Sequence, residues 1–142
     1  MVATPRCFTS DAPPNLGHMH SSRLHVVLID SPPTDSAAAV AFWGAALGHR
    51  PEPEGDTPFT VLAPLGSGQI LAHQRLDEGP PRMHLDIETD DTSAEVARLE
   101  TLGATRLSEH DGCIQMHDPA GLVFCVVPVQ SEDFAQHATA WP

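Results

Sequence analysis

The sequence has no lysine and no long apolar run, and each absence argues against certain classes of function. Nineteen acidic residues stand against seven arginines, so the formal net charge is −12 at pH 7. A chain this acidic repels phosphate backbones and anionic headgroups, which argues against nucleic acid and membranes as partners. No apolar stretch approaches the roughly 18 residues of a membrane-spanning helix. The first residues also lack the basic-then-apolar pattern of a signal peptide.

Cysteine and aromatic residues are scarce as well. The three cysteines, Cys7, Cys113 and Cys125, are an odd number without the spacing of a disulfide framework, which favours a reducing compartment. We therefore expect a soluble, cytoplasmic protein. Five Phe, two Trp and no Tyr provide few stacking walls, which disfavours a cavity that binds flat aromatic antibiotics.

The 142 residues are enough for one domain with one core. Residues 1–22 contain three prolines and no hydrophobic periodicity, so we expect a disordered tail there. Residues 23–130 form the expected single domain, and 131–142 form a C-terminal tail. Within the domain we distinguish two modules, at about 23–76 and 82–130.

The two modules repeat one plan. The first module contains RLHVVLID followed by a helix that ends in FWGAALGHR. The second module contains the similar stretch RMHLDIET followed by a helix that ends in RLETLGATR. Apolar periodicity and glycine stops predict helices near 35–47 and 92–102. The second helix begins with Thr92 and Glu95 at the spacing of a capping box. Each module therefore reads β-α-β-β-β, which predicts an α+β fold.

Side-chain alternation assigns the faces of the first strand in each module. Leu24, Val26 and Leu28 are expected beneath a helix, with His25 on the other face. In the second module, Met83, Leu85 and Ile87 oppose His84, Asp86 and Glu88. Two such sheets side by side predict a curved, mostly antiparallel sheet around a concave cavity, with the helices outside and both histidines inside.

These motifs resemble the vicinal oxygen chelate superfamily, the glyoxalase, bleomycin-resistance and extradiol dioxygenase group, and most closely its small glyoxalase-like branch. The resemblance rests on Leu-His-Val at 24–26, Phe-Trp-Gly-Ala-Ala-Leu-Gly at 42–48, Met-His-Leu-Asp at 83–86, Asp-Pro-Ala-Gly at 118–121 and Phe-Cys-Val-Val-Pro at 124–128. It spans residues 23–130 and implies the two-module fold described above.

The resemblance also implies a set of metal ligands. Metal enzymes of that superfamily take one ligand from the first and one from the last strand of each module. The first strands provide His25 and His84, and the last strands place Leu71 and Cys125 at the corresponding positions. A register shift of two residues would put His73 in place of Leu71. Leucine cannot bind a metal, whereas cysteine either ligates a soft divalent ion or forms a small apolar wall.

We therefore expect the residues of a ligand cavity to be His25, His73, His84, Asp86 and Cys125. His25 and His84 are expected to converge and to hold a divalent metal ion. His73 and Asp86 are the candidate catalytic groups. Glu88 shares a face with Asp86, but we expect it to be solvated near the strand end. Buried imidazoles without a partner are costly, so the histidines should be bonded to water, an acid such as Asp86, or a metal.

Two functions fit these observations. In the first, the protein is a lyase, isomerase or dioxygenase whose metal polarises vicinal oxygens on a small molecule. In the second, it is a metal-free binding protein of the antibiotic-resistance type that uses the same cavity. The exposed edges of the expected sheet also predict a homodimer.

Overall fold

The computed structural model describes residues 19–142. Residues 1–18, with Cys7 and most of the expected disordered tail, lie outside the described residues. The elements in chain order are β1 (His20–Ser31), α1 (Ser36–Leu47), β2 (Glu52–Pro53), β3 (Phe59–Gly66), β4 (Gln69–Arg75), β5 (Arg82–Thr89), α2 (Thr92–Thr101), β6 (Thr105–His110), β7 (Cys113–His117), β8 (Val123–Pro128), α3 (Phe134–His137) and β9 (Thr139–Trp141).

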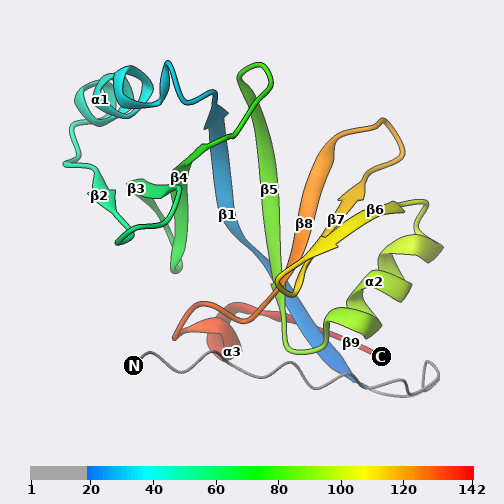
Figure 1. Ribbon diagram of the computed structural model, residues 1–142. Coiled ribbons are helices and arrows are strands. Elements are labelled where there is room, and N and C mark those ends of the chain that lie inside the picture. Colours follow the sequence, from blue (N-terminus) through cyan, green and yellow to red (C-terminus); the bar gives the residue numbers. More distant parts are fainter. Residues whose placement is uncertain (1–18) are drawn as a thin grey trace, which may run out of the picture.

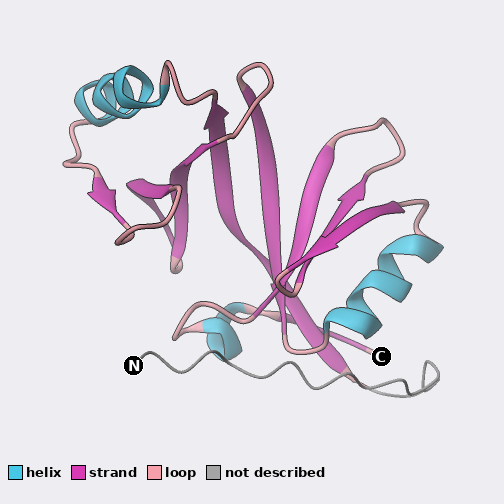
Figure 2. Ribbon diagram, in the orientation of Figure 1, coloured by secondary structure: helices cyan, strands magenta, loops and turns pink. Residues whose placement is uncertain are grey.

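All nine strands belong to one sheet. Eight of them follow the order β2-β3-β4-β1-β5-β8-β7-β6, and β9 pairs with the start of β1. β1 and β5, the first strands of the two modules, pair antiparallel at the centre. Each also pairs in parallel with the last strand of its own module, β4 or β8. Figures 1 and 2 show the two halves on either side of this central pair. The predicted α+β fold is confirmed.

The core of the second module lies between α2 and the sheet. Its buried residues are Val96, Ile114, Met116, Phe124 and Val126, with Leu85, Ile87 and Leu99 packed against them. The face of β5 that carries Leu85 and Ile87 therefore points toward α2, as predicted. The face that carries His84 and Asp86 points away from that helix.

The start of α2 differs from the predicted capping box. The N-cap is Asp91, whose carboxylate accepts a hydrogen bond from the backbone N–H of Ala94. Glu95 is fully buried and instead binds His20 and Ser22 of β1. Because the Glu95 carboxylate already contacts a ring nitrogen and a hydroxyl group of β1, it does not turn back to the helix start.

Helix α1 is covered far less than α2. Its buried residues are Ser36 and Gly44, whereas Phe42 is 61% exposed. The sequence of α1 is apolar almost all round, so it has no single apolar stripe that would select one face for the sheet. Figure 1 shows α1 at the outer end of the first module, beyond β4.

In the first module, Val26 and Leu28 of β1 lie on the opposite face from the one predicted, whereas His25 lines the cavity as expected. Val26, Leu28 and Ala72 form a second apolar cluster, and they line a cavity together with Asp86 on the face turned away from α2. The prediction assumed that the apolar set of β1 packs under a helix. However, β1 is a central strand with apolar residues on both faces, so alternation alone cannot choose between them.

The C-terminal segment, expected to be a tail, is attached to the sheet. β9 pairs with the first residues of β1, and the Trp141 indole donates a hydrogen bond to Ser22. Before it, the backbone N–H groups of Gln130 and Ser131 both donate to the buried Glu88. β1 therefore begins at His20, inside the stretch assigned to the N-terminal tail. No helix within residues 19–142 is long and apolar enough to cross a membrane.

Candidate metal and ligand site

A cavity of about 330 Å³ lies on the face of the sheet turned away from α2. Its apolar lining consists of Val26, Leu28, Phe59, Ile70 and Ala72, and its polar lining of His25, Glu54, Asp86 and Gln130. The apolar residues all come from the first module, and the polar ones approach from several sides. A volume near the lower end of ordinary ligand sites suits a small molecule.

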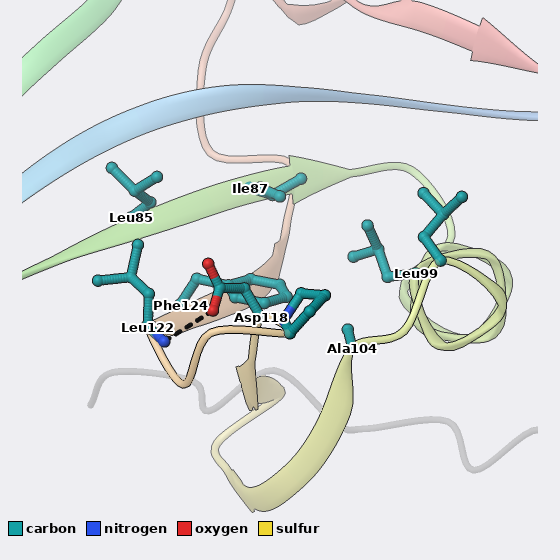
Figure 3. Close-up of a pocket in the computed structure, with 9 residues that line it drawn as sticks. Leu85, Ile87, Leu99, Ala104, Asp118, Leu122 and Phe124 are labelled. Atoms are coloured by element: carbon teal, nitrogen blue, oxygen red, sulfur yellow. Dashed lines mark hydrogen bonds between the residues drawn. The ribbon is translucent and has the colours of Figure 1, made fainter.

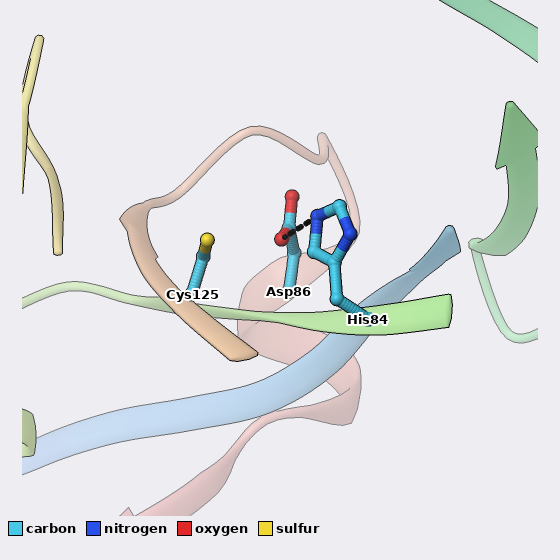
Figure 4. Close-up of side chains that lie close together, drawn as sticks. All are labelled: His84, Asp86 and Cys125. Carbon is cyan, nitrogen blue, oxygen red and sulfur yellow. Dashed lines mark ion pairs between the residues drawn. The ribbon is translucent and has the colours of Figure 1, made fainter. Parts of the chain in front are cut away.

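Three metal-binding side chains meet beside this cavity. One donor atom each from His84, Asp86 and Cys125 lies within 4.8 Å of the other two. His84 and Asp86 are alternate residues of β5, and Cys125 is the direct neighbour of Asp86 on β8. Figure 4 shows the three side chains rising from the same face of the two strands. The cluster therefore follows from strand register, with β5 contributing two donors and β8 the third.

Asp30 at the end of β1 orients the ring of His84. The Nδ1 atom of His84 lies 2.7 Å from Oδ2 of Asp30, and Nε2 lies 3.5 Å from Oδ1 of Asp86. Arg82 also donates to the same Asp30 oxygen over 3.2 Å. Histidines that ligate metals almost always donate their second ring N–H to a carboxylate or carbonyl, which fixes the tautomer. The contact with Asp30 holds His84 in this way, with Nε2 on the side of Asp86.

The charge state of His84 follows from its two carboxylate neighbours. Burial alone would lower its pKa, but the hydrogen bond to Asp30 and the charge of Asp86 outweigh burial and raise the pKa to about 9. In the metal-free protein His84 is therefore an imidazolium at neutral pH. A cation bound at Nε2 would replace that proton, so metal binding at this site releases a proton.

Two buried carboxylate oxygens support the metal assignment. Oδ1 of Asp86 and Oδ1 of Asp30 have no hydrogen-bond partner among the described residues. The Asp86 oxygen has only the ion pair with Nε2 of His84 at 3.5 Å, and a buried charged acceptor without a hydrogen bond is costly. A divalent cation at the Asp86 oxygen would supply a closer partner. The imidazole, carboxylate and thiol fit Zn²⁺ or a similar borderline cation.

Cys125 lies near a second thiol. The pKa of Cys113 is lowered chiefly by Cys125, and the pKa of Cys125 is raised by Cys113 and then by burial. Cys125 is not among the residues that line the cavity. Its place within the three-donor cluster favours a role as a metal ligand.

The structure brings His25 into the cavity but not into the three-donor cluster. A bulge between Leu24 and Val26 makes His25 the extra residue of β1, and bulges re-aim side chains. His25 thus lines the same cavity as Val26. Its Nδ1 lies 3.9 Å from the carboxylate of Glu88 and has no hydrogen-bond partner in the described part of the chain. His25 is therefore not part of the group of His84, Asp86 and Cys125 that could hold an ion, and its expected pairing with His84 as metal ligands stays a prediction.

His73 lies on the opposite face of the sheet. It is fully buried, and its Nε2 is 2.6 Å from the hydroxyl of Ser31, which in turn contacts Ser36 of α1. On β4 it alternates with Ala72, which lines the cavity. Leu71 shares the face of His73 and pairs with Val27. The expectation that His73 reaches the cavity is wrong because β4 turns Ala72 to that side.

Two residues of the site were missed or misjudged from sequence. Asp30 is fully buried and contacts His84, and no role was predicted for it. Its position two residues after Leu28, on the same face of β1, could have revealed that role. Glu88 was expected to be solvated but is also fully buried, and it accepts a hydrogen bond of 2.7 Å from Nε of Arg23. Burial alone would raise the pKa of Glu88, but bonds from Ser131, Arg23 and two backbone N–H groups lower it. Segment 130–133 covers the strand end, and sequence did not reveal that contact.

A second hollow of about 230 Å³ lies beside α2 on the other face of the sheet. Figure 3 shows that it is lined mainly by apolar side chains from the sheet and α2. Its acidic residue, Asp118, already accepts hydrogen bonds from the backbone N–H groups of Ala120 and Leu122. This hollow therefore offers no unpaired reactive group.

The glyoxalase-like domain profile matches residues 26–127, which include most of both modules and the whole donor cluster. The chain belongs to the glyoxalase-like domain family. The resemblance stated from the sequence motifs is confirmed. No curated protein matches the chain in sequence.

Solved structures show the same fold at low sequence identity. One is described as an NAD-dependent benzaldehyde dehydrogenase from Legionella pneumophila (TM-score 0.55, 13% identity, 73% of this chain and 99% of that one). Another is the hypothetical protein BH1468 from Bacillus halodurans (TM-score 0.55, 11% identity, 78% and 96% covered). A third is 2,2',3-trihydroxybiphenyl 1,2-dioxygenase from Sphingomonas wittichii (TM-score 0.51, 10% identity, 78% and 42% covered). At these identities the likeness concerns the fold alone.

Proposed function

We propose that this glyoxalase-like protein is a metal-dependent enzyme that acts on a small molecule with vicinal oxygens. The ion is held by His84, Asp86 and Cys125, and the substrate occupies the adjoining cavity. The observation that carries the proposal is the orientation of His84, whose Nδ1 is fixed by Asp30 while Nε2 faces Asp86. This is the arrangement of a metal ligand with its supporting carboxylate.

The chemistry follows from what surrounds the donor cluster. When bound there, a divalent cation supplies Lewis-acid polarisation of a substrate oxygen and stabilises developing negative charge. His25 lines the cavity without belonging to the donor cluster, so it is the group that we assign to move a proton at the substrate. His73, the other histidine named from the sequence, is excluded from that role by its position beneath α1. The reaction class is a lyase, isomerase or dioxygenase reaction.

The cavity restricts the substrate. Val26, Leu28, Ile70 and Ala72 form one apolar wall, and Asp86 and Gln130 provide polar groups opposite it. A substrate with a short apolar end and an oxygen-rich end would satisfy both sides. The cavity of about 330 Å³ holds a compact molecule rather than an extended one.

A metal-free binding protein is the second candidate, and one observation favours it. His84 already has partners without an ion, because Asp30 accepts its Nδ1 proton and Asp86 lies near Nε2. The raised pKa of His84, about 9, keeps an imidazolium beside Asp86, which lines the cavity, and this positive charge could attract an anionic ligand. In this case the same residues would bind ligand with no catalysis.

Metal content separates the two candidates. Protein prepared without a histidine tag should contain close to one divalent ion per chain, measured by plasma mass spectrometry. His84→Asn should remove it, while His73→Asn, which changes an equally buried histidine on the other face, should retain it. Folding of both variants is checked by circular dichroism. Metal-free wild-type protein that also fails to take up Zn²⁺, Mn²⁺ or Fe²⁺ would leave only the binding function.

His25 is tested separately from the ion. His25→Ala should keep the metal and lose turnover or ligand binding, because it lines the cavity without belonging to the donor cluster. If His25→Ala loses the metal, His25 and His84 would both be metal ligands, as expected from the sequence.

We also expect a homodimer. The strands at the two ends of the sheet, β2 and β6, are each paired on one side within the described chain, and such edges are commonly covered by association. Sedimentation equilibrium should give twice the chain mass of 15.2 kDa. A mass of one chain at all concentrations would remove this expectation.

A further inference from the structure

Cys113, the first residue of β7, was given no role by the sequence. Gln115 of β7 pairs with Cys125 of β8, so Cys113, two residues before Gln115, lies on the same face of the sheet. Cys125 lowers the pKa of the neighbouring Cys113, and the charges of His84 and Asp86 also act on Cys113. Four potential metal ligands are therefore gathered on one face of β5, β8 and β7.

The register makes a disulfide between these two cysteines unfavourable. They are diagonal neighbours rather than directly opposed, and such pairs have Cα atoms about 7–8 Å apart. Disulfides usually require about 4.4–6.8 Å. Both cysteines are free in the structure. Two neighbouring thiols without the geometry for a covalent bond can still share one ion.

We propose that Cys113 is a fourth ligand, which converts the cluster of His84, Asp86 and Cys125 into a two-thiolate site for a thiophilic cation, with Zn²⁺ as its occupant. This inference rests on the metal site proposed above and specifies its ion. Two thiolates favour zinc over the hard cations Mg²⁺ and Ca²⁺, which take oxygen ligands. The set of two sulfurs, one imidazole nitrogen and one carboxylate oxygen matches the donors that bind zinc in proteins.

Cys113 has the freedom that this role needs. It is not among the three residues whose donor atoms lie within 4.8 Å of one another, so its thiol must rotate toward the ion. Its side chain is half-buried, whereas Cys125 is buried. The preceding turn, Asp111 and Gly112, ends the β6–β7 connection and leaves Cys113 at the start of its strand. Zinc sites can expand to five ligands during reaction, so four protein ligands still leave a place for one substrate oxygen.

The test uses cobalt as a spectroscopic substitute for zinc. All proteins carry Cys7→Ser, which removes the third thiol, and are kept reduced. Co²⁺ is titrated into this parent, into Cys113→Ser, into Cys125→Ser and into the double variant. Sulfur-to-cobalt charge transfer in the near ultraviolet reports the number of bound thiolates independently of any activity. Zn²⁺ affinity is then measured by competition with a chromophoric chelator, and folding by circular dichroism.

We expect the charge-transfer intensity to fall by half in each single variant and to vanish in the double variant. Zn²⁺ affinity should fall at least tenfold in Cys113→Ser, the lower end of the range seen when even a supporting residue is removed. If Cys113→Ser keeps the full band and affinity while Cys125→Ser loses both, Cys113 is not a ligand and the three-donor site stands. If no variant, including the parent, binds Co²⁺ or Zn²⁺, the metal site itself is wrong. A disulfide found in the parent under reducing conditions would also overturn the inference.

Discussion

In the first module, Leu28 lies between Ala72 of β4 and His84 of β5, and in the second, Asp86 lies between Cys125 of β8 and Val26 of β1. These are corresponding places in two copies of one plan. The first copy fills its places with apolar residues and the second with residues that could bind a metal. The first module therefore supplies the apolar wall of the cavity together with His25, and the second supplies the three-donor cluster.

A bulge explains why the sequence repeat hides this division. Aligning the motifs matches His25 with His84, but His84 pairs with Leu28 in the sheet, and His25 is the extra residue opposite the Ile87–Asp86 step. The bulge offsets the two strands by one residue and turns Val26 and Leu28 to the cavity. A single inserted position thus changes which residues of β1 correspond to the ligands of β5.

The modules also differ in how their helices are packed. α2 contributes Val96 to a cluster of five buried apolar residues, whereas the two buried residues of α1, Ser36 and Gly44, belong to neither of the two apolar clusters in the described part of the chain. His84, Asp86 and Cys125 therefore lie on strands of the better packed second module, where strand positions are held more firmly. The following predictions test this contrast.

The largest difference should appear in core truncations. Met116 is fully buried in the cluster beneath α2, so Met116→Ala should cost about 2–5 kcal/mol of unfolding free energy. Phe42 on α1 is 61% exposed, so Phe42→Ala should stay within about 0.5 kcal/mol. Urea denaturation followed by circular dichroism measures both. Equal losses in the two variants would mean that α1 is packed as tightly as α2.

The next effect concerns pH in the metal-free protein. The folded-state pKa of His84 is raised to about 9, above the ordinary value of 6.5, so the folded state holds its proton more tightly. This contribution to stability is complete below pH 6.5 and is lost as pH rises through about 9. Between pH 7 and pH 10 the unfolding free energy should fall by about 2–3 kcal/mol from this group.

Asp30→Asn supplies the control for the pH experiment. Asn keeps the shape but removes the charge that holds the His84 proton, so the loss of stability between pH 7 and pH 10 should shrink. Chelator is present throughout, and unfolding is measured in urea at each pH. An unchanged slope in the variant would show that another group causes the pH dependence.

A smaller effect should mark the point where α1 meets its loop. A Cβ added at Gly44 would lie 2.6 Å from Cγ of Pro51, and a proline ring gives way poorly. Gly44→Ala should therefore lose about 1–2 kcal/mol, because the clash outweighs the roughly 1 kcal/mol that alanine gains in a helix. The double variant with Pro51→Ala should recover most of the loss, measured as a thermodynamic cycle. Stabilisation by Gly44→Ala alone would mean that α1 moves freely away from Pro51.

The fold was readable from local signals because they are repeated and consistent. Both long helices lie within two residues of their expected bounds, 35–47 and 92–102, since apolar periodicity and glycine stops act over a few residues. The family resemblance was readable for the same reason. His84, Asp86 and Cys125 were also named from sequence, because β5 alternates cleanly and β8 follows the Asp-Pro-Ala-Gly turn.

The amino-acid sequence by itself determined the two-module α+β plan, the acidic charge and the strand that carries His84 and Asp86. Only the tertiary structure decided which donors meet. The bulge at His25, the burial of His73 beneath α1 and the approach of Asp30 to His84 depend on cross-strand register. Register sets which face a residue occupies, and a shift of one position reverses it. That choice is made between strands far apart in the chain, where no local pattern records it.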